Sequence, residues 1–349
     1  MFAVIGTLLE DFRLQPDQIA AKVAQRTDQW VSKPFAAAQG LSAAEFRATY
    51  LGVVEDALEL ARTDVVEASP SSDPLPPAYD WRTNASYATC VGPVVDQLKC
   101  GSCWAVSAAE AFSDRHCVAN RARASANFTR LEMSALDLIA CDKECKSLFS
   151  PQCNRGCQGG YPELAWKYLK EKGIVSADCM PYNLTKQLLC PLPSCRPPHD
   201  HTLHKARTYK HVLGGADAVR HELLTGGPVQ ATFTVFEDFM TYSGGVYKYV
   251  TGRKLGLHAV KVVGYGVTEN GTEFWSAMNS WGTSFGVNGT FQVSRATALP
   301  PAAALRARPR LNACNWRGAD RSRRVWLREW GVRRQAVRRG GGRRLPVAN

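Results

Sequence analysis

The sequence predicts an α+β fold in two lobes, with helices gathered in one lobe and strands in the other. Residues 105–118 are rich in alanine and lack glycine and proline, as expected of a helix that begins near Cys103. Beyond residue 227, short runs of β-branched and aromatic residues lie between glycines, as expected of strands. A chain of 349 residues is long enough for two lobes and an additional segment.

The net charge of +12 arises in one terminal segment. Residues 296–349 contain 14 arginines and no lysine, against only two acidic residues, Asp320 and Glu329. Residues 1–295 therefore carry equal numbers of acidic and basic side chains. Such a balance implies no basic face on the body of the protein, which argues against nucleic acid as a partner. The sequence also shows no apolar run long enough for a membrane span.

Twelve cysteines, most of them between Cys90 and Cys195, indicate either disulfides or zinc. Zinc fingers repeat Cys-x-x-Cys pairs, whereas here only Cys100 and Cys103 are spaced in this way, so disulfides are favoured. Setting aside Cys103 as a candidate nucleophile, and Cys314 in the terminal segment, leaves ten cysteines for five bridges. Five Asn-x-Ser/Thr sequons support an oxidising secretory route and glycosylation: Asn84, Asn127, Asn183, Asn270 and Asn288.

Cys103 is the first candidate for chemistry. At a helix N-terminus, free N–H groups and the positive end of the macrodipole favour a thiolate and lower the pKa of a cysteine. We therefore expect Cys103 to be a nucleophile with a depressed pKa. The alternative is a buried or disulfide-bonded cysteine with a structural role.

A histidine and an asparagine are expected to meet in the second half of the chain. His258 lies near the start of an apolar strand over residues 257–266, and a lone histidine there would ordinarily be structural. After a turn at Asn270, the strand over residues 274–278 leads directly to Asn279. Adjacent antiparallel strands place such residues side by side.

Separated motifs resemble those of the papain-like cysteine peptidases, closest to the cathepsin B branch. The resemblance runs from about Gln15 to Arg295 and includes Cys, His and Asn in that order. It implies a two-lobed papain-like fold, with a helical left lobe over about residues 80–200, a β-barrel-like right lobe over about 205–295, and a cleft between them. The motifs are Gln97 with Cys100-Gly101-Ser102-Cys103-Trp104, then Gly156-Cys157-Gln158-Gly159-Gly160-Tyr161-Pro162, then His258, and then Asn279-Ser280-Trp281-Gly282.

The resemblance also implies roles for individual residues. Cys103 would attack the peptide carbonyl as a thiolate paired with His258, Asn279 would orient the imidazole, and the Gln97 amide would help to form the oxyanion hole. No metal or organic cofactor is required, and disulfides Cys90–Cys117 and Cys100–Cys157 follow from the family pattern. Substrate would be bound by Gly159, Gly160, Tyr161, Pro162, Ala259 and Trp281.

The N-terminal region is expected to be a propeptide. Apolar residues from Gln15 to about Leu60 follow a helical pattern that suits docking on another surface, and the stretch resembles the short propeptide of cathepsin B-type enzymes, which blocks the cleft. A plain N-terminal helical subdomain is the alternative. The linker at residues 67–77 is rich in Ser and Pro and suits cleavage, which gives a pro-region over 1–74 and a peptidase domain over 75–295. Residues 1–9 form a poor signal peptide.

One loop departs from the cathepsin B pattern. The span from Cys179 to Tyr209 is shorter than the family's occluding loop, and its histidines fall as His199-Asp200-His201 instead of an adjacent pair. We interpret them as solvated loop histidines. The departure favours endopeptidase over dipeptidyl carboxypeptidase activity.

The terminal segment 296–349 breaks with the family, which continues with a closing strand. Its dense arginine predicts disorder. Three accounts stay open: a translation artefact, a genuine basic extension that binds polyanions, and a folded module. If it is an artefact, the right lobe lacks its terminal strand and the floor of its S2 pocket.

The sequence therefore predicts a monomeric cysteine endopeptidase made as a propeptide-inhibited zymogen. Its partners would be protein or peptide substrates, its own propeptide and cystatin-like inhibitors, in the secretory pathway and then in a lysosome, a vacuole or the extracellular space. A non-catalytic papain-like binding module is one alternative, although Cys103, His258, Asn279 and Gln97 are all present. A polyanion-binding protein acting through the basic tail is the other.

Overall fold

The structure is a computed structural model, and the chain divides into two compact units, residues 1–305 and residues 306–349. The fold described below belongs to the first unit. Several sequence expectations fall outside the described residues, among them the leader at 1–9, most of the linker, His199 and almost all of the terminal segment. The structure describes residues 11–54, 65–67, 74–123, 128–147, 151–184, 190, 195, 201–213 and 215–297.

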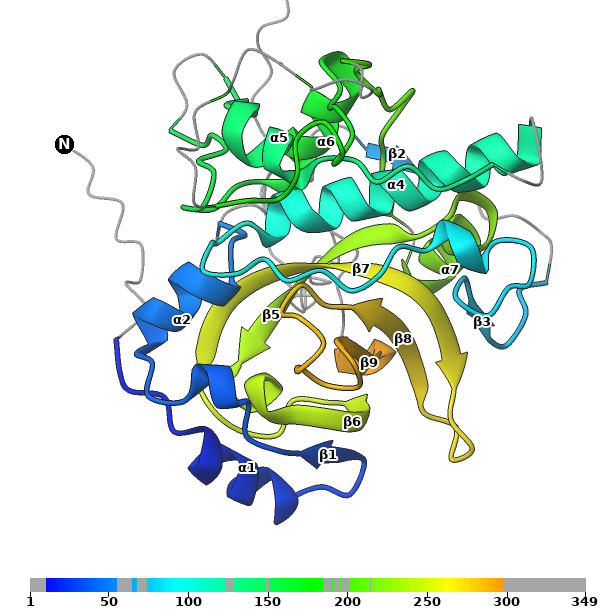
Figure 1. Ribbon diagram of the computed structural model, residues 1–349. Coiled ribbons are helices and arrows are strands. Elements are labelled where there is room, and N and C mark those ends of the chain that lie inside the picture. Colours follow the sequence, from blue (N-terminus) through cyan, green and yellow to red (C-terminus); the bar gives the residue numbers. More distant parts are fainter. Residues whose placement is uncertain are drawn as a thin grey trace, which may run out of the picture. The chain divides into compact units, whose positions relative to one another are not determined.

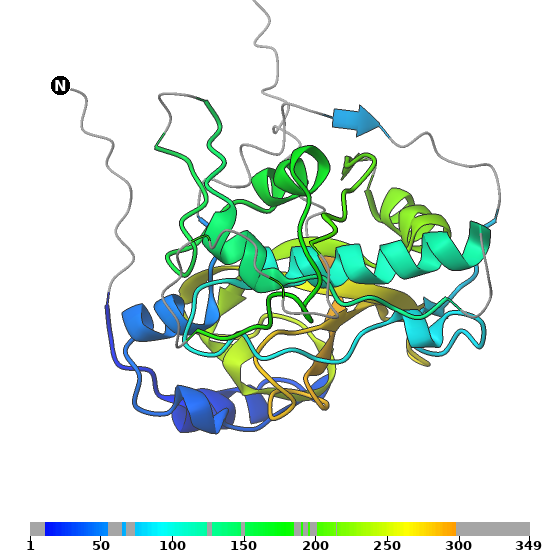
Figure 2. The ribbon, with the colours of Figure 1, turned by 45° about the horizontal axis from the view of Figure 1, so that its top comes forward.

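The predicted helices of the left lobe are present. The long helix α4 (Cys103–Arg123) begins at Cys103, as expected. Helix α5 (Ala135–Cys141) is capped by the Ser134 side chain, and α6 (Pro162–Glu171) starts with a proline in its first turn. Figures 1 and 2 show α5 and α6 on one side of α4 and the sheet on the other. The core between these helices contains Trp104, Leu138, Ile139, Leu169 and Ile174.

The right lobe is a sheet built around one long, strongly curved strand, β7 (Lys254–Val267) (Figure 1). The strand order is β1-β6-β9-β8-β7-β3, and β5 also pairs with β7. Aromatic side chains on these strands fill the core of the lobe, which explains the β-branched and aromatic runs of the sequence. The other strands are β3 (Tyr79–Asp80), β4 (His211–Leu213), β5 (Val229–Phe236), β6 (Tyr242–Tyr247), β8 (Glu273–Met278) and β9 (Thr290–Ser294).

Shorter elements complete the fold. Helix α7 (Gly215–Gly226) follows β4, and β2 (Val65–Glu67) pairs with β4 in parallel. The short 3₁₀ turns are η1 (Ala36–Ala38), η2 (Ala88–Cys90), η3 (Glu237–Thr241) and η4 (Arg295–Thr297). Within the described ranges, no helix has both the length and the apolar character that a bilayer crossing needs.

The N-terminal region differs from the continuous helical pattern that we expected. Helices α1 (Pro16–Ala24) and α2 (Ala43–Tyr50) are present, but Trp30 lies in a strand, β1 (Trp30–Ser32), which pairs antiparallel with β6. The Trp30 ring packs against Tyr247, with ring centroids 5.3 Å apart. Tertiary packing therefore overrides the local pattern, because an edge of the sheet pairs the backbone and buries the indole together.

Five disulfides use the ten cysteines that we assigned to bridges. Cys90–Cys117 and Cys100–Cys157 are the two pairs that the family pattern implies. Cys103 is the free cysteine of the described residues. The alternative of a disulfide-bonded Cys103 is therefore wrong. The remaining pairs are Cys141–Cys190, Cys145–Cys153 and Cys179–Cys195.

Candidate active site

Cys103 stands where the two lobes meet. It is the first residue of α4, and its side chain is fully buried. Its Sγ accepts a hydrogen bond of 3.4 Å from the backbone N–H of Ala259, which lies on β7 of the other lobe. The residue before Ala259 on that strand is His258. Helix and strand thus bring together the sulfur and the imidazole-bearing backbone that the sequence placed 155 residues apart.

The His258 ring is held by Asn279 and covered by Trp281. His258 Nε2 lies 2.7 Å from Asn279 Oδ1, which also accepts from the Ser280 N–H at 2.8 Å. The indole of Trp281 lies over the imidazole with ring centroids 4.9 Å apart. Because an amide oxygen only accepts, Nε2 carries the proton and Nδ1 keeps its lone pair. Among the described residues, buried Nδ1 has no hydrogen-bond partner, so it is the nitrogen free to serve as a base.

Gln97 is also buried, and its side chain is fixed at both ends. Its Oε1 accepts from the Ser280 hydroxyl at 2.6 Å. Its Nε2 donates to the Cys100 carbonyl at 2.9 Å and to the Thr49 carbonyl at 3.1 Å. One N–H of this amide is thus directed at a carbonyl oxygen that belongs to the N-terminal region, which is the kind of contact an oxyanion-hole donor makes.

Residues 49–54, which are the end of α2 and the extended chain after it, fill the cleft and hydrogen-bond to both lobes. The Tyr50 carbonyl accepts from the Trp281 indole at 2.8 Å. The Gly52 carbonyl accepts from the Gly160 N–H at 2.9 Å, and the Val54 N–H donates back to the Gly160 carbonyl at 3.3 Å. Val53 forms a parallel bridge with Gly160 and an antiparallel bridge with Leu257 on β7. The cleft therefore holds a backbone that hydrogen-bonds as an added strand would.

At Gly52 the N-terminal region packs against the backbone just before Cys103 so closely that no side chain fits. A Cβ at Gly52 would lie 2.3 Å from the Gly101 carbonyl oxygen and 3.1 Å from the Ser102 nitrogen, both just before Cys103. Phe46 and Tyr50 of α2 pack edge-to-face against Trp281, with ring centroids 5.6 and 5.5 Å away. The N-terminal region thus excludes water from the cysteine and the histidine together.

This exclusion reverses the charge state that we expected from the helix N-terminus. Burial raises the pKa of Cys103 to about 12, although backbone N–H groups of Ala259, Trp104 and Val53 oppose the shift. Burial lowers the pKa of His258 to about 4, although its bond to Asn279 opposes that shift. Desolvation by burial outweighs the effect of the helix N-terminus, so in this blocked state Cys103 is a neutral thiol and His258 a neutral imidazole.

The expected substrate-binding residues lie in three places. Gly159 and Gly160 flank the blocking chain, and a Cβ at Gly159 would lie 3.1 Å from the Gly52 carbonyl oxygen. Tyr161 packs with Val54. Ala259 and Trp281 contact Cys103 and His258, as described above. Pro162 opens α6 and lines a separate cavity of about 300 Å³ between α6, β4, α7 and β5.

Sequence analysis missed two hydroxyl groups that support Gln97. Ser280 belongs to the Asn-Ser-Trp-Gly motif, so its position could have suggested a role. Tyr182 donates to the Gln97 carbonyl at 2.9 Å, and its hydroxyl lies 3.0 Å from that of Ser102. Nothing in the sequence around Tyr182 predicts this contact, because 85 residues separate it from Gln97.

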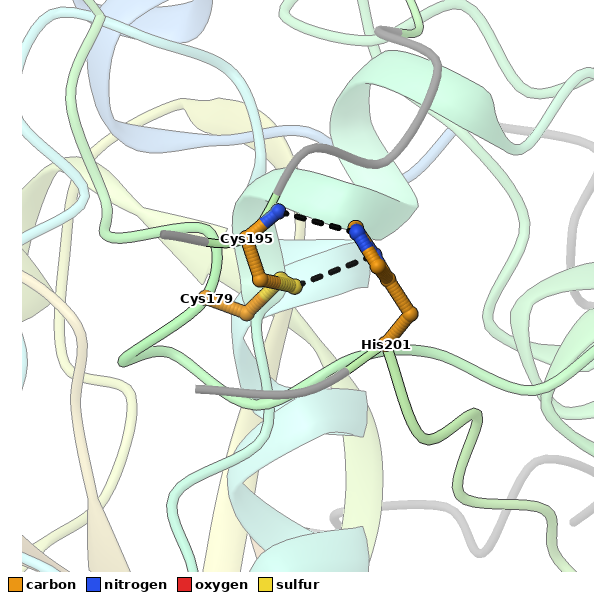
Figure 3. Close-up of side chains that lie close together, drawn as sticks. All are labelled: Cys179, Cys195 and His201. Carbon is orange, nitrogen blue, oxygen red and sulfur yellow. Dashed lines mark hydrogen bonds between the residues drawn. A yellow bond between two sulfur atoms is a disulfide. The ribbon is translucent and has the colours of Figure 1, made fainter. Parts of the chain in front are cut away.

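His201 does not hang free in its loop. Figure 3 shows its ring against the Cys179–Cys195 bridge: Nε2 accepts from the Cys195 N–H at 3.1 Å, and Nδ1 lies 3.1 Å from Cys195 Sγ. Both sulfurs are bonded to each other, so they offer no thiolate to a metal ion. Of the described residues, this is the one cluster with metal-ligand spacing, and its donors are already engaged. His201 is exposed, as expected, but its ring makes hydrogen-bond contacts to Cys195 of the disulfide.

Comparison with known proteins assigns the family. Residues 75–307 match the papain family of cysteine proteases. A cathepsin B of Dictyostelium discoideum is 36% identical over 249 residues, which cover 64% of this chain and 73% of that protein. A cathepsin B-like protein of Giardia intestinalis, CP1, is 36% identical over 66% of this chain and 72% of its own length. The chain belongs to the papain family of cysteine proteases.

Solved structures of proforms show the same architecture. A procathepsin B from Trypanosoma congolense superposes with a TM-score of 0.69 at 27% identity, covering 81% of this chain and 94% of that one. A digestive procathepsin L from Tenebrio molitor gives a TM-score of 0.61 at 25% identity, covering 80% and 84%. The protein is thus a papain-like cysteine peptidase, most similar in kind to cathepsin B-like enzymes, with the two-lobed α+β fold that we expected.

Proposed function

We propose that this protein is a zymogen in which Cys103, His258, Asn279 and Gln97 form the catalytic set and residues 11–54 are the inhibitory segment. The observation that carries the proposal is the chain at residues 49–54, which places backbone on every group that a substrate would use. Its carbonyl oxygens accept hydrogen bonds from the Gln97 amide and the Trp281 indole, and its backbone pairs with that of Gly160. Removing this chain would expose the whole set at once.

Chemistry would begin once the cleft is open. Water would then reach the site, and Cys103 would transfer its proton to His258 Nδ1, because the burial that disfavours both charges is gone. The thiolate would attack the peptide carbonyl, forming a C–S bond while the oxyanion is held by Gln97 Nε2 and the Cys103 backbone N–H. His258 would return the proton to the departing amine as the C–N bond breaks. Water would hydrolyse the thioester, with His258 as base, and regenerate the thiol.

The positions of Asn279 and Trp281 support the role given to His258. Asn279 Oδ1 fixes Nε2–H, and its own orientation is fixed by the Ser280 N–H. Nδ1 therefore keeps the lone pair that a base needs, without a tautomer change. The Trp281 indole covers the bond between His258 and Asn279 from solvent, and a hydrogen bond excluded from water is stronger than an exposed one.

The chain direction of residues 51–54 would explain why Cys103 does not cleave them. The segment runs parallel to the strand at Gly160, and the family resemblance implies that substrates run the opposite way. A chain in reverse would not present its carbonyl to Cys103 in the attacking geometry. Cleavage within the linker at residues 67–77 would then separate the pro-region (1–74) from the peptidase domain (75–295).

Wider aspects of the proposal rest on sequence and family resemblance. We place the protein in the secretory pathway, with a lysosome, a vacuole or the extracellular space as its destination, because of its disulfides and sequons. Substrates would be proteins or peptides cut internally, and cystatin-like proteins would inhibit the opened cleft of the monomer. The short loop around His201 favours endopeptidase activity.

A thiol-directed epoxide tests the catalytic assignment. After acid activation, the wild-type protein is expected to hydrolyse a peptide amide and to take up one equivalent of the epoxide at Cys103. The Cys103→Ala variant should do neither while keeping its thermal stability. Labelling of the activated protein at another residue, or hydrolysis by Cys103→Ala, would overturn the assignment.

A further inference from the structure

A buried aspartate and asparagine stand directly behind the glycine segment of the cleft. Asp142, just past the end of α5, is fully buried, and its Oδ1 accepts from the Glu144 N–H at 2.8 Å. Its Oδ2 accepts from Asn154 Nδ2 at 2.6 Å. Asn154 is 2% exposed, and its Oδ1 accepts from the Tyr161 N–H at 2.7 Å. This chain of bonds leads from α5 to the strand at Gly160.

The last bond acts on the peptide group that faces the cleft. The Tyr161 N–H and the Gly160 carbonyl belong to one trans peptide, so they point in opposite directions in a single plane. Asn154 holds the N–H side, and the carbonyl side accepts from Val54 at 3.3 Å. A bond on one side of an amide both orients and polarises the carbonyl on the other.

Asp142 decides which way the Asn154 amide faces. An ionised carboxylate only accepts, so it draws Nδ2 toward itself and leaves Oδ1 for Tyr161. A flipped amide would set Nδ2 against the Tyr161 N–H, donor against donor. Little space exists for other arrangements, since a Cβ at Gly160 would lie 2.6 Å from Asn154 Oδ1.

We propose that Asp142 and Asn154 are positioning residues for peptide binding, which aim the Gly160 carbonyl at the N–H of the chain in the cleft. The inference rests on the proposed function and extends it to the support of the substrate-binding strand. The hydrogen bonds of these two side chains within the described residues go to Glu144, to Tyr161 and to each other, and not to Cys103, His258 or Gln97, so their effect falls on binding and spares the chemical step. Propeptide and substrate should depend on them alike, because both use the same carbonyl.

Three variants separate orientation from mere packing. Asp142→Asn is isosteric, but with its oxygen on the Glu144 N–H it turns an NH₂ group toward Asn154 Nδ2. Asn154→Asp places two carboxyl groups at the 2.6 Å spacing of the present bond, so the pair keeps one proton: a protonated Asp142 donates to position 154, whose other oxygen accepts from Tyr161. In the double swap, the amide at position 142 donates to the carboxylate at position 154, whose other oxygen accepts from Tyr161, so all the bonds are restored.

Asp137→Asn is the matched control. Asp137 is a buried aspartate of α5 whose Oδ2 accepts one backbone N–H, from Val175 at 2.9 Å, and an asparagine oxygen can replace it there. Among the described residues, Val175 makes no hydrogen bond to the segment 49–54 that fills the cleft. Burial raises the pKa of Asp142 to about 7, so measurements belong at a pH of about 7.5, where the carboxylate form prevails.

Two readouts are measured on the full chain. In the uncleaved protein, the rate at which a small neutral thiol reagent labels Cys103 reports how often residues 49–54 leave the cleft. After acid activation, KM and kcat are measured with a peptide amide. Asp142→Asn should raise the labelling rate and KM roughly tenfold, the worth of one well-made hydrogen bond, with kcat within about twofold. Asn154→Asp, the double swap and Asp137→Asn should match the wild type.

The inference fails if folded Asp142→Asn keeps the wild-type KM and labelling rate, or if the double swap remains as impaired as Asp142→Asn. It also fails if kcat falls while KM stays constant. An activated wild type without peptidase activity would instead refute the proposed function. The labelling rates of the uncleaved variants would still decide the role of Asp142 and Asn154.

Discussion

Acid should open the cleft through His258, because the blocked state holds this imidazole neutral. In a Cys103→Ala chain, where no thiol shares the proton, the pKa of His258 is about 4 with the cleft filled and about 6.5, that of a histidine in water, with the cleft open. A lowered pKa stabilises the closed state fully above pH of about 6.5, and that stabilisation is lost as the pH falls toward about 4. The full difference corresponds to about 3 kcal/mol.

The magnitude follows from the ratio of protonation in the two states. Between pH of about 7 and pH of about 5, an imidazole with these two pKa values favours the open state by a further factor of about 20. Amide hydrogen exchange measures this opening at two bonds of the cleft, the Val54 and Gly160 N–H groups. Protection factors, already corrected for the intrinsic pH dependence of exchange, should fall by about 20-fold over this range.

Adding His258→Gln to the Cys103→Ala chain isolates the cause. Glutamine does not titrate, so the protection factors at Val54 and Gly160 should then change by less than about threefold over the same range. Equal falls in the single and the double variant would show that another group drives the opening. Unchanged protection in Cys103→Ala would refute the argument that burial keeps the imidazole neutral in the closed state.

Three further outcomes are expected. Gly52→Ala should speed Cys103 labelling in the uncleaved chain by more than tenfold, because its Cβ meets the Gly101 carbonyl at 2.3 Å. Lys261→Met should cost about 3–5 kcal/mol of unfolding free energy in chemical denaturation, since it leaves buried Asp114 and Glu110 with Arg130 as their shared cation. Gln97→Ala should lower kcat of the activated enzyme about 10²–10³-fold, the usual cost of one oxyanion donor.

Matched controls accompany these variants. Gly244→Ala adds the same methyl group where the nearest atom is 3.9 Å away, so its labelling rate should equal that of the wild type. Lys167→Met removes a partly exposed ion pair with Glu144, whose loss should cost less than about 1 kcal/mol. A Gly52→Ala labelling rate equal to that of Gly244→Ala, or equal losses of stability for the two lysine variants, would contradict the packing and burial arguments. Undiminished kcat in Gln97→Ala would remove that residue from the oxyanion hole.

Much of the fold and site was predictable because it depends on local patterns. The glycine-free run after Cys103 predicted a helix that the structure confirms. The runs of β-branched and aromatic residues predicted the strands that bring His258 and Asn279 together. Trp30 was the exception, since three residues of edge strand carry no periodic signal of their own. The predicted low pKa of Cys103 was also wrong. A sequence can indicate a helix N-terminus, but it does not show that a distant segment will bury the residue there.

The sequence by itself determined the class of this protein, the residues of its candidate catalytic set and the two disulfides that a family pattern can specify. Those features depend on residue type and spacing, which a chain displays before it folds. Only the tertiary structure decided the charge state of Cys103 and His258, the strand pairing of Trp30 and the support of Gly160 by Asp142 and Asn154. Burial and hydrogen-bond direction cause these, and both depend on which distant segments come to lie against one another.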